Sequence, residues 1–99
     1  MKINKLSDIQ YILRTEKRQL ATKYGVSRIG VFGSFAFGDF TKKSDIDVLV
    51  EFNRSIGLFQ LLSLQEYLSD KLGRKVDLVP KDSLKKYIKK DILKTTVYA

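Results

Sequence analysis

The segment from residue 46 to residue 52 constrains the fold most, because apolar side chains occupy every second position along it. One set of alternate residues is entirely apolar: Ile46, Val48, Val50 and Phe52. The other set, which starts one residue earlier, is mostly acidic: Asp45, Asp47, Leu49 and Glu51. Since successive residues of a strand point to opposite faces, the pattern predicts a strand with one buried face and one face that carries acid groups.

Hydrophobic spacing and end signals predict the elements around this strand. Helices are expected from Ser7 to Gly25, over residues 57–72, and from Asp82 or Ser83 to about Leu93. Further strands are expected over residues 27–32 and 75–79, with a last edge strand over residues 95–98. Ser7 and Gln10 have the spacing of a helix-capping box. Residues 33–44 are too polar and too rich in glycine for a core element, and are expected to form a tight loop with one helical turn.

This order of elements predicts an α/β (α+β) fold in a single domain over residues 1–99. Its centre would be a small mixed β-sheet of three to four strands, flanked by helices. The leucines of the middle helix that are expected to face the core are Leu58, Leu61, Leu62, Leu68 and Leu72.

Composition excludes several kinds of chemistry. The chain has no Cys and no His, so it can form no disulfide, no cysteine-based zinc site and no Ser-His-Asp triad. Catalysis would depend on carboxylates, Lys, Tyr or a hard cation bound by oxygen. The net charge of +8 favours contact with phosphates, nucleic acid or an acidic protein. The sequence has no apolar run of membrane-spanning length and no signal-peptide pattern at its start, so we expect a cytoplasmic location.

The glycine turn after the strand over residues 27–32 is a candidate phosphate-binding element. Gly33 lets the backbone approach a ligand closely, and Ser34 adds a hydroxyl group. The spacing of Gly33 and Gly38 imitates a P-loop. Asp39-Phe40 follows where a P-loop needs Lys and then Ser or Thr, so a Walker-type site is excluded.

Three aspartates form the candidate catalytic group. Asp45 and Asp47 are two residues apart on the predicted strand and project from one face, so they could converge on a pair of cations. Asp77 lies in an otherwise apolar strand, where an unpaired carboxylate is costly. A third acid from a neighbouring strand would complete a metal site.

Two segments carry a resemblance to a known family: Gly33-Ser34-Phe35-Ala36-Phe37-Gly38, and Ser44-Asp45-Ile46-Asp47-Val48-Leu49-Val50. Together with the later Asp77, they resemble the signature of the polymerase-β-like nucleotidyltransferase superfamily. The short single domain is similar to its minimal nucleotidyltransferases, which often act as antitoxin partners of HEPN-domain ribonuclease toxins.

The resemblance implies a role for each matching residue. Gly33 and Ser34, with Ser44, would bind the nucleotide, whose triphosphate lies against the glycine turn. Asp45 and Asp47 would bind two Mg²⁺ ions, and Asp77 would complete the shell of the catalytic metal and help to deprotonate the attacking hydroxyl. The implied reaction transfers AMP from ATP to a hydroxyl, and the resemblance suggests a Tyr of a partner HEPN-domain toxin as the acceptor.

One position departs from the family pattern, and three functions remain open. Members commonly carry Arg where Phe37 stands, and Phe neither donates hydrogen bonds nor offsets phosphate charge. Lys42 or Lys43 could replace that cation. The chain is thus expected to be an adenylyl-transferring antitoxin, an inactive antitoxin that neutralises its partner by binding alone, or a nucleic-acid binder. The last would use a lysine-rich face formed by Lys85, Lys86, Lys89, Lys90 and Lys94.

Overall fold

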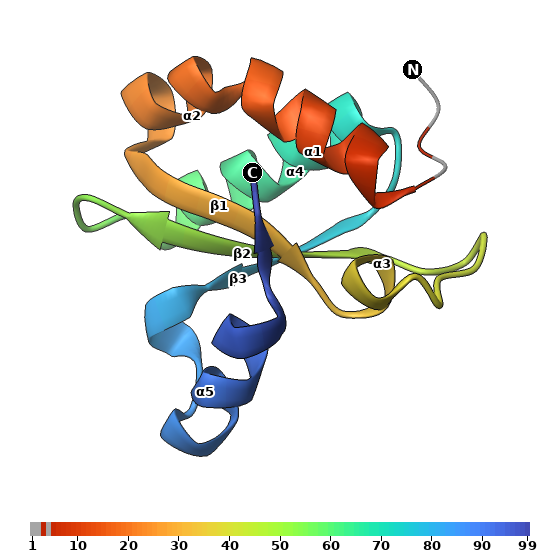
Figure 1. The fold of residues 1–99 in the computed structure, drawn as a ribbon. Helices are drawn as coiled ribbons and strands as arrows, with labels where there is room; N and C mark the ends of the chain where they lie inside the picture. The colour runs from red at the N-terminus through yellow and green to blue at the C-terminus, as the bar shows by residue number, and fades with distance from the viewer. Residues whose placement is uncertain (1–2, 4) are drawn as a thin grey trace.

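The computed structural model describes residue 3 and residues 5–99 as a small mixed sheet with helices on both sides (Figure 1). The strands are β1 (Val26–Phe32), β2 (Ile46–Phe52), β3 (Val76–Pro80) and β4 (Val97–Tyr98). The helices are α1 (Leu6–Thr15), α2 (Lys17–Tyr24), α3 (Ser34–Phe37), α4 (Leu58–Leu72) and α5 (Lys86–Thr95), with a 3₁₀ turn, η1, at Lys81–Ser83. No helix in the described part of the chain is long and apolar enough to cross a membrane.

The strands lie in the order β3-β2-β1-β4. β1 pairs antiparallel with both β2 and β4, while β2 pairs parallel with β3. A parallel pair needs a crossover connection, and α4 provides it. The predicted mixed sheet and the predicted edge strand at the C-terminus are both confirmed, with β4 shorter than expected.

Helices α1, α2 and α4 cover one face of the sheet, and α5 lies on the other (Figure 1). The main core forms on the first face, where the even-numbered residues of β2 pack against buried residues of the three helices. The odd-numbered residues of β2 therefore face α5. Leu49 belongs to this second face and is fully buried there, so the face is not purely acidic.

The first predicted helix is divided in two at Glu16, and it begins earlier than expected. Lys5, not Ser7, is the N-cap, and its backbone N–H donates to the Asp8 carboxylate at 3.2 Å. Glu16 accepts a hydrogen bond from the Tyr67 hydroxyl at 2.9 Å and pairs with Lys71 at 3.2 Å. Both partners come from α4, so the break coincides with a tertiary contact that local spacing does not reveal.

Two of the leucines predicted to face the core are exposed. Leu58 is 68% exposed and Leu62 is 50% exposed, whereas Leu64 is fully buried. The buried stripe of α4 consists of Leu64, Leu68 and Leu72, with Leu61 partly buried beside it. At about 100° per residue, Leu58 points about 80° and Leu62 about 120° away from the centre of the stripe.

The last helix also starts later than predicted. Asp82 and Ser83 lie in η1, Leu84 is extended, and Lys85 is the N-cap of α5. The Ser83 hydroxyl donates to the Pro80 carbonyl at 2.7 Å, so it stabilises the 3₁₀ turn instead of a helix N-terminus.

Candidate active site

Asp47 and Asp77 are direct neighbours on two parallel strands. β2 and β3 pair in a register that places Asp47 opposite Asp77. Paired residues on neighbouring strands point to the same face, and the strands lie about 4.8 Å apart. The two carboxylates therefore share the face of the sheet on which α5 lies, with Asp47 half-buried and Asp77 exposed.

The carboxylate of Asp47 is influenced by both of the other predicted acids. Partial burial of the side chain raises the pKa of Asp47 above its usual value, and the charges of Asp77 and Asp45 raise the pKa further. Each of these causes disfavours the ionised carboxylate. A cation between the carboxylates would reverse the effect, so the charge distribution fits a divalent metal ion.

The carboxylate of Asp45 also has an ionic contact outside this group. Its Oδ2 lies 3.8 Å from Nζ of Lys75, and both side chains are well exposed to solvent. Among the residues that the structure describes, no three acidic side chains converge into a ready-made metal cage. A bound cation would therefore compete with the ammonium group of Lys75 for Asp45.

The close contact with Asp47 requires a glycine at position 33. It follows β1 directly, and Phe32 at the end of β1 pairs with Asp47. A Cβ atom added to Gly33 would overlap Oδ2 of Asp47 and lie 3.1 Å from its Cγ. The backbone of Gly33, with φ of 73° and ψ of −150°, is in a region that only glycine adopts readily. The glycine turn and the carboxylate are thus fitted to each other.

The segment that joins α3 to β2 is fixed by packing on Phe35. The rings of Phe35 and Phe40 stack with centroids 4.1 Å apart, and the guanidinium of Arg74 lies 5.1 Å from the centroid of Phe35. Arg74 also donates a hydrogen bond from Nη2 to the carbonyl of Lys42 at 2.9 Å. Arg74 comes just before β3, so it ties the loop between residues 38 and 45 to the strand that carries Asp77.

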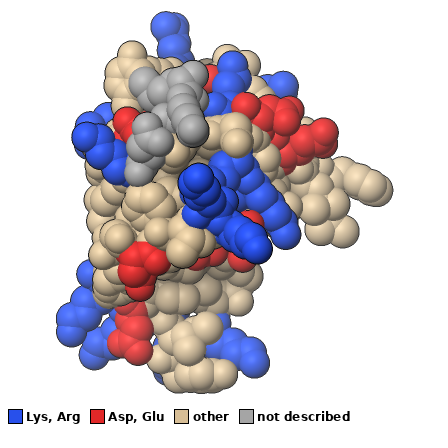
Figure 2. Space-filling model, turned by 90° about the vertical axis from the view of Figure 1, so that its right-hand side faces the viewer, with Lys and Arg blue, Asp and Glu red and all other residues tan. Residues whose placement is uncertain are grey.

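No sequence motif points to Arg74, and Ser44 has a contact within the loop that its sequence position does not reveal. The hydroxyl oxygen of Ser44 accepts a hydrogen bond from the backbone N–H of Thr41 at 2.8 Å, which closes the turn before Asp45. Phe37 in α3 is 67% exposed. Figure 2 shows the end of the molecule where this loop lies, with Lys and Arg side chains gathered at its centre directly above acidic ones.

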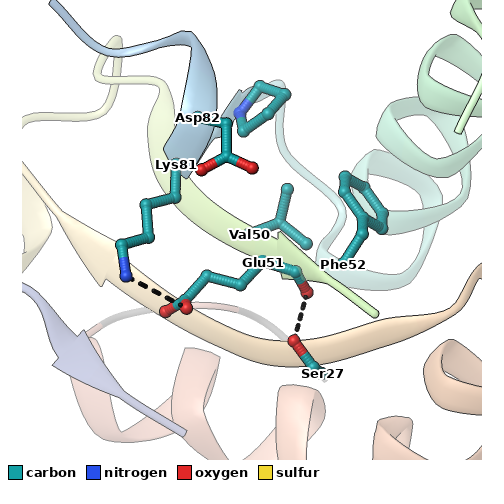
Figure 3. A pocket seen from close by; sticks show the side chains of 7 residues that line it. Ser27, Val50, Glu51, Phe52, Lys81 and Asp82 are labelled. Atoms are coloured by element: carbon teal, nitrogen blue, oxygen red, sulfur yellow. Dashed lines mark hydrogen bonds and ion pairs between the residues drawn. The ribbon is translucent and has the colours of Figure 1, made fainter. Parts of the chain in front are cut away.

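Glu51 lies on the same face as Asp47 but belongs to a separate group of contacts. Its carboxylate pairs with Nζ of Lys81 at 3.3 Å and with Arg28 at 3.9 Å, and it accepts a hydrogen bond from the Tyr98 hydroxyl at 3.4 Å. Figure 3 shows the contact with Lys81 beside a cavity of about 120 Å³. These contacts link β1, β2, β4 and η1, so Glu51 has a structural role.

Glu51→Gln is expected to lower the free energy of unfolding by about 1–2 kcal/mol. The amide of Gln has nearly the shape of the carboxylate but lacks its charge, so the ion pairs with Lys81 and Arg28 are lost. For a domain of this size, the melting temperature should fall by roughly 4–8 °C per kcal/mol. Thermal unfolding followed by circular dichroism measures the change, with the exposed Glu66→Gln as the control. If Glu51→Gln melts at the same temperature as Glu66→Gln, the carboxylate of Glu51 does not link these elements.

Paired carboxylates beside a glycine turn are groups that phosphoryl- and nucleotidyl-transfer sites use. The family model described as "Nucleotidyltransferase domain" matches residues 13–99, and the chain belongs to this family. It is therefore a nucleotidyltransferase.

Similar proteins and structures agree with this assignment. The chain is 44% identical to the protein adenylyltransferase MntA of Thermococcus cleftensis, over 94% of each chain. A solved structure of a candidate minimal nucleotidyltransferase superposes with a TM-score of 0.79 at 29% identity, over 95% of each chain. The fold also matches a complex between a tri-AMPylated Shewanella oneidensis HEPN toxin and an MNT antitoxin, with a TM-score of 0.67 at 20% identity over 91% of this chain and 70% of that one.

Proposed function

We propose that this chain transfers AMP from ATP, with Mg²⁺, to a tyrosine hydroxyl of a HEPN-domain toxin and thereby acts as its antitoxin. The observation that carries the proposal is the in-register pair of Asp47 and Asp77 with Gly33 packed against Asp47. The similarity to a protein adenylyltransferase over 94% of both chains supports a protein acceptor and an adenylyl donor. A cytoplasmic location, where ATP is supplied, is part of the proposal.

In the proposed mechanism, Asp45, Asp47 and Asp77 would hold Mg²⁺ and the glycine turn would bind the triphosphate. When bound, the metal would supply positive charge to offset the negative charge that develops on the phosphates. The fit rests on the raised pKa of Asp47, which comes first from its partial burial and then from the charges of Asp77 and Asp45. Gly33 and Ser34 bind the phosphates, and Ser44 keeps the turn before Asp45 closed and contributes to the nucleotide-binding edge.

The transfer itself forms one bond and breaks one. The acceptor oxygen bonds to the α-phosphorus, the bond from that phosphorus to the bridging oxygen breaks, and pyrophosphate leaves. Asp77 accepts the proton of the attacking hydroxyl. It is suited to this task because its side chain is more exposed than that of Asp47, so an acceptor on another protein can reach it.

The second proposed function is neutralisation by binding alone, and Phe37 favours it. An exposed aromatic ring, 67% accessible, stands where the family pattern has a cation. In this case Asp47→Asn would still protect cells that express the toxin. Loss of protection with Asp47→Asn, at equal protein levels, would favour the transfer reaction.

Phe37→Arg is expected to lower the KM for ATP by about threefold to tenfold, because a guanidinium beside the glycine turn adds a charge-assisted contact to phosphate. Initial rates over a range of ATP concentrations measure this change. Phe59→Arg, on α4, is the matched control, since Phe59 is also highly exposed at 87%. If both variants change the KM equally, a general increase in positive charge accounts for the effect.

The direct test of the proposal uses labelled ATP, Mg²⁺, the purified chain and a HEPN-domain toxin protein as the partner. Label should appear on that partner only when Mg²⁺ is present, and the intact mass of the partner should increase by one or more AMP groups. Partner that stays unlabelled and unchanged in mass, while the chain still neutralises it, would rule out the transfer reaction and leave binding alone.

A further inference from the structure

Helix α5 carries a row of lysines that does not stabilise the helix itself. Lys86, Lys90 and Lys94 are spaced four residues apart on one side of the helix, and all three are exposed. Like charges at this spacing destabilise a helix. The first turn contains no acid, and Lys85 and Lys86 stand at the end where positive charge is unfavourable.

These charges have no partner inside the described part of the molecule. The ion pairs found there use Arg28, Lys71, Lys75 and Lys81, and none uses a lysine of α5. Asp91 is the single acid within α5. The row therefore presents a net positive charge that is fully available to a binding partner.

The same helix has an incompletely covered apolar side. α5 contains no buried residue, Tyr87 is 74% exposed and Ile88 is 39% exposed. The residues of this helix are all exposed or only partly buried. Exposed apolar side chains next to lysines suit a protein surface, because a protein partner can cover the former and pair with the latter.

The position of α5 relative to the carboxylates gives this surface a role. α5 lies on the face of the sheet to which Asp47 and Asp77 point, opposite to α1, α2 and α4 (Figure 1). α5 leads into β4, whose Val97 pairs with Val31, the residue before the strand partner of Asp47. Two strand spacings separate β4 from β2, so the C-terminal end of α5 lies about 10 Å to the side of the catalytic strand.

We propose that the lysine row of α5 is the docking surface for the acceptor protein and binds an acidic segment of it. The inference rests on the proposed transfer to a protein hydroxyl and adds where that protein binds. A protein fits better than a nucleic acid, because α5 has no Arg, Asn or Gln, three of the side chains that most often read base edges. Docking here would bring the acceptor hydroxyl to the open side of Asp77.

The test reverses two charges of the row with Lys86→Glu and Lys90→Glu in one variant. Glu at these positions suits the N-terminal half of a helix, so α5 should remain folded. The matched control is Lys17→Glu with Arg18→Glu in α2, on the opposite face of the sheet. Initial rates of AMP transfer are measured over a range of HEPN-domain partner and, separately, of ATP, at low and high salt.

The expected result is an increase of at least about tenfold in the KM for the partner, with kcat and the KM for ATP within twofold of wild type. High salt should raise the KM for the partner in the wild type more than in the variant. The control variant should behave as wild type. Equal KM values for the partner in the α5 variant and in the control would overturn the docking proposal.

Two further outcomes separate the alternatives. If the wild type transfers no AMP to any acceptor, the proposed function fails, independently of α5. The other outcome is that the α5 variant transfers AMP with an unchanged KM for the partner, while a single-stranded (dT)20 oligonucleotide binds the wild type and not the variant. In that case the lysine row binds nucleic acid, and the docking proposal is wrong.

Discussion

Asp47→Asn is expected to lower the rate of AMP transfer at saturating ATP and Mg²⁺ by at least about 10³-fold, because it removes the carboxylate at the centre of the site. Asp47 faces Asp77 across the parallel strand pair, and partial burial together with the charges of Asp77 and Asp45 raises the pKa of Asp47. Single-turnover transfer of labelled AMP to the partner measures the loss. Asp70→Asn on α4 is the control, since it removes an equal charge from an exposed position away from the site.

The same substitution is expected to leave the fold at least as stable, which separates a catalytic from a structural role. The folded state raises the pKa of Asp47, so it binds this proton more tightly than the unfolded chain does. The charge of Asp47 therefore opposes folding at neutral pH, and this penalty disappears as the pH falls through the raised pKa to below 3.8.

In metal-free buffer, Asp47→Asn should therefore melt at or above the wild-type temperature at pH 7, and the difference should shrink as the pH falls. Thermal unfolding in the presence of a chelator measures both quantities. A variant that melts well below wild type at pH 7 would mean that Asp47 stabilises the fold, and its loss of activity would no longer identify a catalytic group.

Gly33→Ala is the second substitution with a large expected effect, because a side chain at this position would both collide with Asp47 and strain the backbone. The new methyl group would overlap Oδ2 of Asp47, and the backbone conformation of Gly33 costs any other residue about 1–3 kcal/mol. Asp47 must move away, so transfer should fall by at least about 10²-fold, since small misplacements of catalytic groups cost this much. The free energy of unfolding should fall by about 1–3 kcal/mol.

The matched control for Gly33→Ala is Gly73→Ala. Gly73 also has a positive φ, of 66°, but a Cβ there meets no heavy atom within 4 Å. It should lower stability by about 1 kcal/mol and leave transfer unchanged. Chemical denaturation and initial rates are measured on both variants. If Gly33→Ala loses no more activity than Gly73→Ala, the close fit of the glycine turn to Asp47 has no role in the reaction.

Much of the fold could be predicted because strong local patterns agree with the tertiary structure. The alternation over residues 46–52 gave β2 its bounds, and the following helix ends at Gly73, in a left-handed conformation, as its position suggested. The register of β2 with β3 was beyond the sequence patterns. Only the structure shows that Asp47 and Asp77 are opposite each other, and their assigned roles remain predictions.

The errors arose where tertiary contacts decide the outcome. Leu58 and Leu62 are apolar and lie at helical spacing, as core residues do. Only the orientation of α4 on the sheet shows that they point outward. Arg74 carries no motif, because its importance comes from a ring and a carbonyl that are distant in sequence. The ion pair of Asp45 with Lys75 likewise depends on how the ends of two strands meet.

The most direct measurement is the binding of Mn²⁺, as a spectroscopic substitute for Mg²⁺, in the presence of a non-hydrolysable ATP analogue. Electron paramagnetic resonance should show tight binding to the wild type and at least about tenfold weaker binding to Asp77→Asn, with Asp70→Asn unchanged. If Asp77→Asn binds Mn²⁺ as tightly as the wild type, carboxylates from the two neighbouring strands do not form a shared metal site, and the account of this enzyme is wrong.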